Sequence, residues 1–133
     1  MSILIRPALL ADLDQLVALE KTCFDTDQLS RRSFKHWITT EHRALLVAEQ
    51  ANVISGYVLI IYHPGTRLAR VYSLAVAPSQ RGTGVAKLLM SAGEQAATDA
   101  GRLYLRLEVS VDNTAAIKLY ESLGYQKFGI YRD

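Results

Sequence analysis

Seven residues that run from the end of a predicted strand into the first turn of a predicted helix have the composition of an anion-binding turn. They follow the apolar, β-branched run 71–76 and precede a segment with apolar residues at helical spacing: Arg81, Gly82, Thr83, Gly84, Val85, Ala86 and Lys87. The first amides of a helix lack partners within it and carry the positive end of its dipole, and glycines let a phosphate approach closely. The turn therefore predicts a phosphate site, with Lys87 adding a charge, although glycines at such a turn also occur for structural reasons alone.

The turn lacks the patterns of two common nucleotide-binding loops. Lys87 stands where the dinucleotide fingerprint G-x-G-x-x-G needs its third glycine, and the P-loop pattern G-x-x-x-x-G-K-[ST] is absent. Instead, Arg81-x-x-Gly84-x-Ala86 resembles the [RQ]-x-x-G-x-[GA] pyrophosphate loop of the GNAT acetyltransferases. The placement is also similar to that family, since the turn follows a strand that ends in Ala75-Val76-Ala77-Pro78.

A second run of residues extends the resemblance into the C-terminal part of the chain. Leu107-Glu108-Val109 is followed by Asn113-x-x-Ala116-Ile117-x-Leu119-Tyr120-Glu121 and then by Leu123-Gly124-Tyr125. These runs are similar to the L-E-V, N-x-x-A-I-x-L-Y and L-G-[FY] runs of the ribosomal-protein alanine N-acetyltransferase branch of the family. Two motifs at the family's separation are stronger evidence than either one alone.

The resemblance implies acetyl-coenzyme A as co-substrate and no metal. Its pyrophosphate would lie on the amides of the turn, with contacts from all seven residues 81–87. In this family the strand before the turn and the next long strand splay apart, and the pantetheine arm pairs with the backbone of the first strand, here Leu74, Ala75 and Val76. A backbone amide of that strand would stabilise the negative charge that develops on the thioester carbonyl oxygen.

The same resemblance implies roles for three side chains. Glu108 matches the general base, which takes a proton from the attacking ammonium directly or through water, and Tyr120 matches the general acid, which protonates the leaving thiolate. Asn113 matches a residue that hydrogen-bonds the pantetheine arm. Each has a plainer alternative: a strand glutamate paired with Arg106, a core aromatic, and a helix cap. The base role would place Glu108 among buried apolar neighbours.

The periodicities predict the element order β-α-α-β-β-β-α-β-α-β. Strands are expected at 3–6, 44–49, 53–62, up to 76, 103–109 and 125–131, with a bulge at Gly56, and helices at 11–24, 30–38, 83–100 and after Asn113. An antiparallel meander followed by a helix and a further strand predicts a mixed sheet. With the resemblance, the fold class is α/β (α+β), a GNAT fold. Its mixed, mostly antiparallel sheet would have six or seven strands, splay at the cofactor cleft, and carry about four flanking helices.

Length and composition fit one domain over residues 1–133. Hydrophobic residues make up 50% of the chain, enough for a core, and the 15 basic residues are scattered among 13 acidic ones, which argues against nucleic acid. The single cysteine excludes an internal disulfide. Because the sequence shows neither a leader nor a run of roughly 18 apolar residues, we expect a cytoplasmic protein with no membrane partner.

Other reactive residue types predict no site. His36, His42 and His63 share no metal-ligand spacing, and Cys23 is expected as a small buried apolar residue because no base lies beside it in the sequence. In the GNAT fold the loop and helices between the first two strands line the acceptor side, so residues 23–37 are where acceptor choice is expected to lie.

The C-terminus departs from the resemblance. Members of the branch continue with a tyrosine-containing loop and a seventh strand, whereas this sequence ends at Tyr131-Arg132-Asp133. Three alternatives stay open: a second chain supplies the strand, the sequence is truncated, or the cleft is open. An exposed sheet edge there would favour a homodimer.

These observations predict an enzyme, an N-acetyltransferase that moves the acetyl group of acetyl-coenzyme A directly to a primary amine. The acceptor would be a protein N-terminus or a small molecule. An alternative from another class is a non-catalytic acyl-coenzyme A binding or sensing module. A third is an interaction domain that keeps the fold and binds no coenzyme A.

Overall fold

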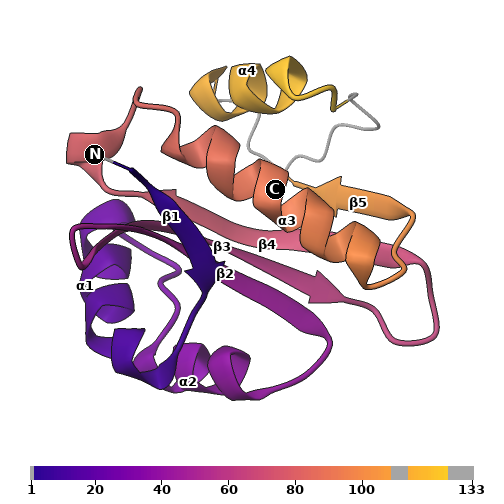
Figure 1. Ribbon diagram of the computed structural model, residues 1–133, viewed down its shortest axis with the longest axis horizontal. Helices are drawn as coiled ribbons and strands as arrows, with labels where there is room; N and C mark the ends of the chain where they lie inside the picture. Colours follow the sequence, from indigo (N-terminus) through magenta and orange to yellow (C-terminus); the bar gives the residue numbers. More distant parts are fainter. Residues whose placement is uncertain (1, 109–113, 126–133) are drawn as a thin grey trace.

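The computed structural model describes residues 2–108 and 114–125, and a five-stranded sheet forms its centre (Figure 1). β1 (Leu4–Pro7), β2 (Arg43–Gln50), β3 (Val53–Tyr62) and β4 (Leu68–Val76) are antiparallel neighbours in that order. β5 (Tyr104–Leu107) lies parallel to β4 at the edge. The sheet is therefore mixed and mostly antiparallel, as predicted.

In the described part of the chain, four helices cover the two faces of the sheet. α1 (Leu13–Cys23) and α2 (Arg31–Thr39) pack on one face, and α3 (Val85–Asp99) and α4 (Thr114–Ser122) belong to the other. Two short 3-10 helices, η1 (Leu10–Asp12) and η2 (Pro78–Gln80), precede α1 and α3. Each face has its own apolar core, and β3, in the middle of the sheet, contributes alternate side chains to both.

The helix predicted over 30–38 is confirmed as α2. The Ser30 hydroxyl oxygen accepts a hydrogen bond of 3.1 Å from the Ser33 amide and so caps the first turn. Arg31, whose charge opposes the helix dipole at that end, forms an ion pair of 2.7 Å with Asp14 on α1. A cap and a neighbouring carboxylate thus allow a helix with a basic start.

The number of strands differs from the prediction. The described part of the chain has five strands, not six or seven, and Tyr125, where the sixth was expected to begin, follows the turn that ends α4. The rest of that expected strand, 126–131, lies outside the described residues, as do Val109 and Asn113. β1 also includes Pro7, one residue beyond the predicted strand 3–6, because an outer strand can do without one amide donor.

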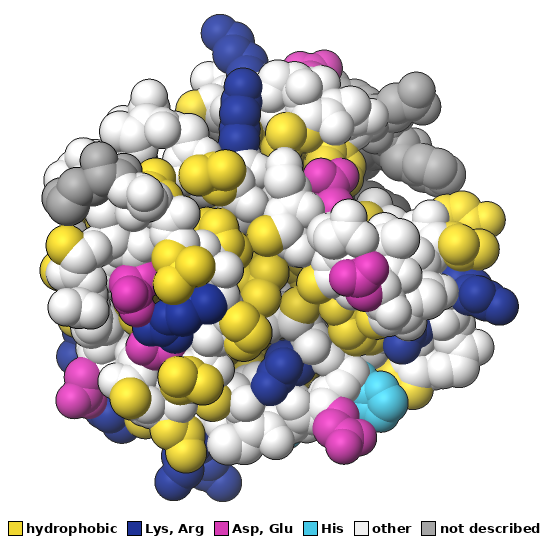
Figure 2. All heavy atoms as spheres, viewed as in Figure 1, with side chains coloured by type: hydrophobic (Ala, Val, Ile, Leu, Met, Phe, Trp, Pro, Cys, Tyr) yellow, Lys and Arg dark blue, Asp and Glu magenta, His cyan; other side chains and the backbone are white. Residues whose placement is uncertain are grey.

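The surface of the described residues agrees with the dispersed charge of the sequence. On the face in Figure 2, Lys and Arg side chains alternate with Asp and Glu around an apolar centre, and no basic patch forms. Among the helices described, none has the length and apolar character needed to cross a membrane. The same residues contain no cluster of three or more His, Cys, Asp or Glu side chains that could hold a metal ion.

Gly56 lies beside the irregularity predicted for β3. Between β2 and β3 the register shifts from Ala48↔Gly56 to Glu49↔Ile54, which leaves Ser55 as the extra residue. Gly56 itself is required by close packing. A Cβ at this position would lie 2.8 Å from the Ala75 carbonyl oxygen and 3.0 Å from Leu89 Cδ1.

Gly56→Ala is expected to lower the free energy of unfolding by ~1–3 kcal/mol, because the new methyl meets rigid β4 backbone. The matched control is Gly93→Ala on α3, where the Cβ would lie 2.5 Å from the terminal Cδ1 of Ile60, a side-chain end that can turn away, and at an ordinary 3.7 Å from Val58 Cγ1, and where alanine favours the helix. Denaturant unfolding measures both variants. Equal losses in the two would contradict the assignment of the Gly56 effect to β4 backbone.

Candidate functional site

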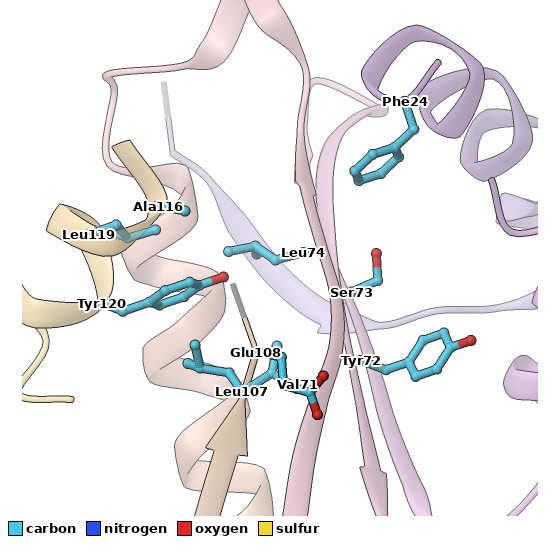
Figure 3. A pocket seen from close by; sticks show the side chains of 10 residues that line it. All are labelled: Phe24, Val71, Tyr72, Ser73, Leu74, Leu107, Glu108, Ala116, Leu119 and Tyr120. Carbon is cyan, nitrogen blue, oxygen red and sulfur yellow. The ribbon is translucent and has the colours of Figure 1, made fainter. Parts of the chain in front are cut away.

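The pairing of β4 with β5 stops halfway along β4. The register runs from Leu68↔Tyr104 to Val71↔Leu107, and β4 then continues to Val76 without a β5 partner among the described residues. A cavity of about 310 Å³ opens at this point, between the end of β5, the middle of β4 and α4 (Figure 3). The described pairing thus ends at the place where the family resemblance implied that the two strands splay apart.

The backbone of β4 faces this opening at alternate residues. The Ala75 carbonyl oxygen faces β3, where it would contact a Cβ on Gly56, and the Ala77 amide donates to Ser55 on the same side at 2.7 Å. Alternation along the strand therefore turns the amides and carbonyls of Leu74 and Val76 toward the opening. The Val76 carbonyl oxygen already accepts hydrogen bonds from Arg81 Nε at 3.2 Å and from Cys23 Sγ at 3.4 Å. The backbone groups of Leu74 are therefore the more available of the two for hydrogen bonds to a ligand.

The glycine-containing turn presents a row of free amides. Gly82 and Gly84 have φ angles of +81° and +91°, which favour glycine, and the Leu88 amide is the first to enter the helix, donating to the Gly84 carbonyl at 3.1 Å. Within the described part of the chain, the amides of residues 82–87 have no acceptor. This is the arrangement that binds an anion at a helix N-terminus.

A second cavity, of about 390 Å³, lies on this turn. Its lining includes Val76, Arg81 and Lys87, and it shares Leu119 of α4 with the first cavity. The two cavities are therefore neighbours, and together we call them the groove: one lies on the free amides of the turn and the other beside the open edge of β4.

Glu108 lies at the first cavity in a different environment from the one predicted. Its side chain is 54% exposed, and its Oε1 is 3.6 Å from Nη2 of Arg70, not paired with Arg106. The parallel register places Arg70 opposite Arg106, two residues before Glu108, so a long side chain from β4 reaches the carboxylate. The prediction of burial was wrong because Glu108 follows the last paired residue of β5, where its neighbours no longer cover it.

Tyr120 reaches the same cavity from α4. Its ring is half-buried and packs edge-on against Tyr125, with centroids 6.0 Å apart. Figure 3 shows its hydroxyl pointing into the space between α4 and β4. Burial raises the pKa of Tyr120 above its ordinary value, so the phenol keeps its proton at neutral pH.

The remaining sequence candidates divide into those that the structure describes and those that it does not. Asn113 lies outside the described residues, and its expected contact stays a prediction. Cys23 packs against the core of the α1–α2 face, and burial raises the pKa of its thiol. It therefore lacks the lowered pKa of a reactive cysteine.

Among the residues that line the first cavity and that the sequence did not single out as site residues are Phe24, Tyr72 and Ser73. Between β3 and β4 the register shifts from Leu59↔Ser73 to Ile60↔Val71, so Tyr72 is an extra, unpaired residue. Because of this bulge, the side chains of both Tyr72 and Ser73 lie on the α1 side of β4 (Figure 3). No local sequence signal marks the bulge, since the run 71–76 reads as an ordinary strand.

Comparisons with known proteins agree with this geometry. Residues 10–125 match the model of the Acetyltransferase (GNAT) family. The chain is 33% identical over 107 residues to a mycothiol acetyltransferase of Kocuria rhizophila, covering 77% of this chain and 35% of that protein. It is 29% identical over 116 residues to the mycothiol acetyltransferase of Thermobispora bispora, covering 84% of this chain and 39% of that protein. The chain thus spans little more than a third of these two relatives.

Solved structures share the fold at lower sequence identity. The ribosomal-protein-S18-alanine N-acetyltransferase from Escherichia coli superposes with a TM-score of 0.85 at 23% identity, covering 96% of this chain and 80% of that one. The PaiA N-acetyltransferase from Thermoplasma acidophilum, in complex with coenzyme A, gives 0.87 at 18% identity, covering 95% and 91%. The glycine turn, the open edge of β4 and the match over residues 10–125 together show that this chain belongs to the GNAT acetyltransferase family.

Proposed function

We propose that this protein is an N-acetyltransferase, which transfers the acetyl group of acetyl-coenzyme A directly to a primary amine of a protein N-terminus or a small molecule. The observation that carries the proposal is the groove, which joins the free amides of residues 82–87 to the cavity between Glu108 and Tyr120 along the open edge of β4. Membership of the GNAT family supports the same activity.

The turn and the strand together would hold the donor. The amides of residues 82–87 bind the pyrophosphate, and the exposed side chains of Arg81 and Lys87 add positive charge beside it. The backbone of Leu74 and Val76 then pairs with the pantetheine amides as an added strand would. Asn113 is proposed to hydrogen-bond the same arm.

The far end of the groove provides the groups that direct transfer requires. Glu108 accepts a proton from the acceptor ammonium, and its exposure favours a route through water. The amine nitrogen bonds to the thioester carbonyl carbon, and a β4 backbone amide, with Leu74 best placed, stabilises the oxyanion. As the carbon–sulfur bond breaks, Tyr120 gives its proton to the thiolate, and the second proton that the nitrogen loses on becoming an amide returns to Tyr120 through solvent. Direct transfer of this kind requires no covalent enzyme intermediate and no metal ion.

The alternative of a non-catalytic acyl-coenzyme A binding module has less support. Such a module would need the turn and the open strand edge, but it would not need a protonated tyrosine hydroxyl aimed into the cavity beside them. The cytoplasmic location and a homodimer formed through a sheet edge stay predictions.

Gly84→Ala is expected to weaken coenzyme A binding about tenfold, equivalent to ~1.4 kcal/mol, because alanine disfavours a φ of +91° and shifts the turn. Gly101→Ala is the matched control, since Gly101 also has a positive φ of +79° and free space around it but follows the far end of α3. Calorimetric titration with coenzyme A measures both. Equal affinities in the two variants would contradict the assignment of the turn.

Tyr120→Phe is expected to lower kcat by ~10²-fold or more, because the thiolate would leave without its proton donor, while coenzyme A affinity changes little. Tyr104→Phe, on an exposed tyrosine of β5, is the matched control. Since burial raises the Tyr120 pKa, the wild type should not lose activity through ionisation of this group below about pH 10. Unchanged kcat in Tyr120→Phe would remove Tyr120 from the mechanism.

Glu108→Gln is expected to lower kcat/KM for the amine by ~10²-fold while the KM for acetyl-coenzyme A stays unchanged, because the amide cannot accept the proton. Glu121→Gln on the exposed surface of α4 is the control for the same loss of charge. Thiol release from acetyl-coenzyme A reports both rates. Full activity of Glu108→Gln across pH would assign the base to another group.

A further inference from the structure

A buried carboxylate is connected to the cavity by two hydroxyl groups. Glu20 of α1 is 2% exposed, and its Oε2 accepts a hydrogen bond of 2.6 Å from the Leu29 amide. Its Oε1 accepts one of 2.6 Å from the hydroxyl of Tyr57, which is fully buried on β3. The Tyr57 oxygen is in turn 2.8 Å from the hydroxyl oxygen of Ser73, which lines the cavity.

The hydrogen bonds that link Glu20, Tyr57 and Ser73 can point in only one direction. A carboxylate is purely an acceptor, and a tyrosine hydroxyl has one proton, which Tyr57 donates to Glu20. Burial and the bond to Glu20 both raise the pKa of Tyr57, so that proton stays in place. Ser73 must then donate its own proton to Tyr57. Its remaining lone pairs have no other partner in the described part of the chain, and they make this wall of the cavity an acceptor.

Ser73 occupies the side of the cavity opposite the proposed proton donor. Its hydroxyl lies on the α1 side of β4, below Phe24, whereas Tyr120 enters from α4 on the other side of the strand (Figure 3). If Tyr120 marks the position of the leaving sulfur, Ser73, on the other side of the strand, faces a group that approaches the thioester from the α1 side. Ser73 is therefore a candidate contact of the acceptor and not of the donor.

We propose that Ser73 accepts a hydrogen bond from the acceptor amine, and that Glu20 and Tyr57 are positioning residues that hold the Ser73 hydroxyl in its accepting orientation. This inference rests on the proposed transfer to an amine. A primary amine can donate one N–H to Ser73 and release another proton to the general base, while its lone pair attacks. An alcohol has a single O–H and cannot do both, so the site selects amines over hydroxyl groups.

Glu20→Gln tests the direction of the hydrogen bonds from Ser73 through Tyr57 to residue 20. The Gln side-chain oxygen must accept from the Leu29 amide, which leaves its NH₂ group facing Tyr57. Tyr57 would then accept from residue 20 and donate to Ser73, and Ser73 would donate into the cavity. A substitution of nearly equal volume thus reverses the polarity that the amine meets.

The experiment measures thiol release with primary amines, including phenethylamine and tripeptide amides. Glu20→Gln and Ser73→Ala are each expected to raise the KM for the amine about five- to tenfold, while the KM for acetyl-coenzyme A stays unchanged. In the Ser73→Ala background, Glu20→Gln is expected to have no further effect. Ser73→Thr, which keeps the hydroxyl, should restore most of the affinity. Thermal melting checks that each variant is folded.

Two kinetic results would overturn the inference. One is an equal effect of Glu20→Gln with and without the Ser73 hydroxyl, and the other is an unchanged amine KM in Ser73→Ala. Because Ser73→Ala leaves the Tyr57–Glu20 bond in place, it provides a test even if Glu20→Gln fails to fold.

Binding separates failure of this inference from failure of the proposed function. If the wild type releases no thiol with any amine, phenethylamine and phenethyl alcohol are titrated calorimetrically into the protein saturated with coenzyme A. Binding of the amine but not the alcohol, weakened about fivefold or more in Ser73→Ala, would support the acceptor contact without catalysis. Absence of amine binding, or equal binding of amine and alcohol, would overturn it.

Discussion

The structure depends on the point at which β4 and β5 stop pairing. Up to Val71 and Leu107 the two strands share a ladder, and beyond it β4 has no neighbour on that side among the described residues. Unpaired strand backbone is costly unless something else satisfies it. A fold that holds β4 in the sheet by pairing it with β3 on the other edge can leave these groups open for a ligand. The cavity, the turn and α4 are all arranged around that opening.

The two edges of β4 explain why β3 is so tightly packed. Gly56 allows the Ala75 carbonyl to approach β3 closely, and the bulge at Ser55 adds a bond from the Ala77 amide. Tyr57, the next residue, is at once a core residue beneath α1 and the middle member of the hydroxyl chain to Ser73. The strand that supports the donor edge therefore also supports the side chain proposed to contact the acceptor.

The sequence predicted those features that depend on neighbouring residues. The apolar run of β3, the Ser30 cap of α2 and the glycine turn before α3 all have local signals, and the structure confirms them. The environment of Glu108 was predicted wrongly because its partner, Arg70, comes from another strand through the register. Ser73 was missed because a bulge, which leaves no mark in the residue pattern, turns it toward α1. Contacts between distant segments and irregularities in strand register decide these positions, and neither can be derived from spacing along one chain.

The open edge of β4 has a consequence for how such a protein can change. The donor is proposed to meet mostly main-chain groups, at Leu74, Val76 and the turn, and apart from the glycines that the turn requires, these groups persist whatever side chains the residues carry. The proposed acceptor side is made of side chains, with Phe24, Tyr72 and Ser73 from two separate segments. Substitutions can therefore alter the choice of acceptor while the donor site stays intact. One backbone framework could in this way serve many acceptors during evolution, and the low sequence identities among chains that share this fold are compatible with that freedom.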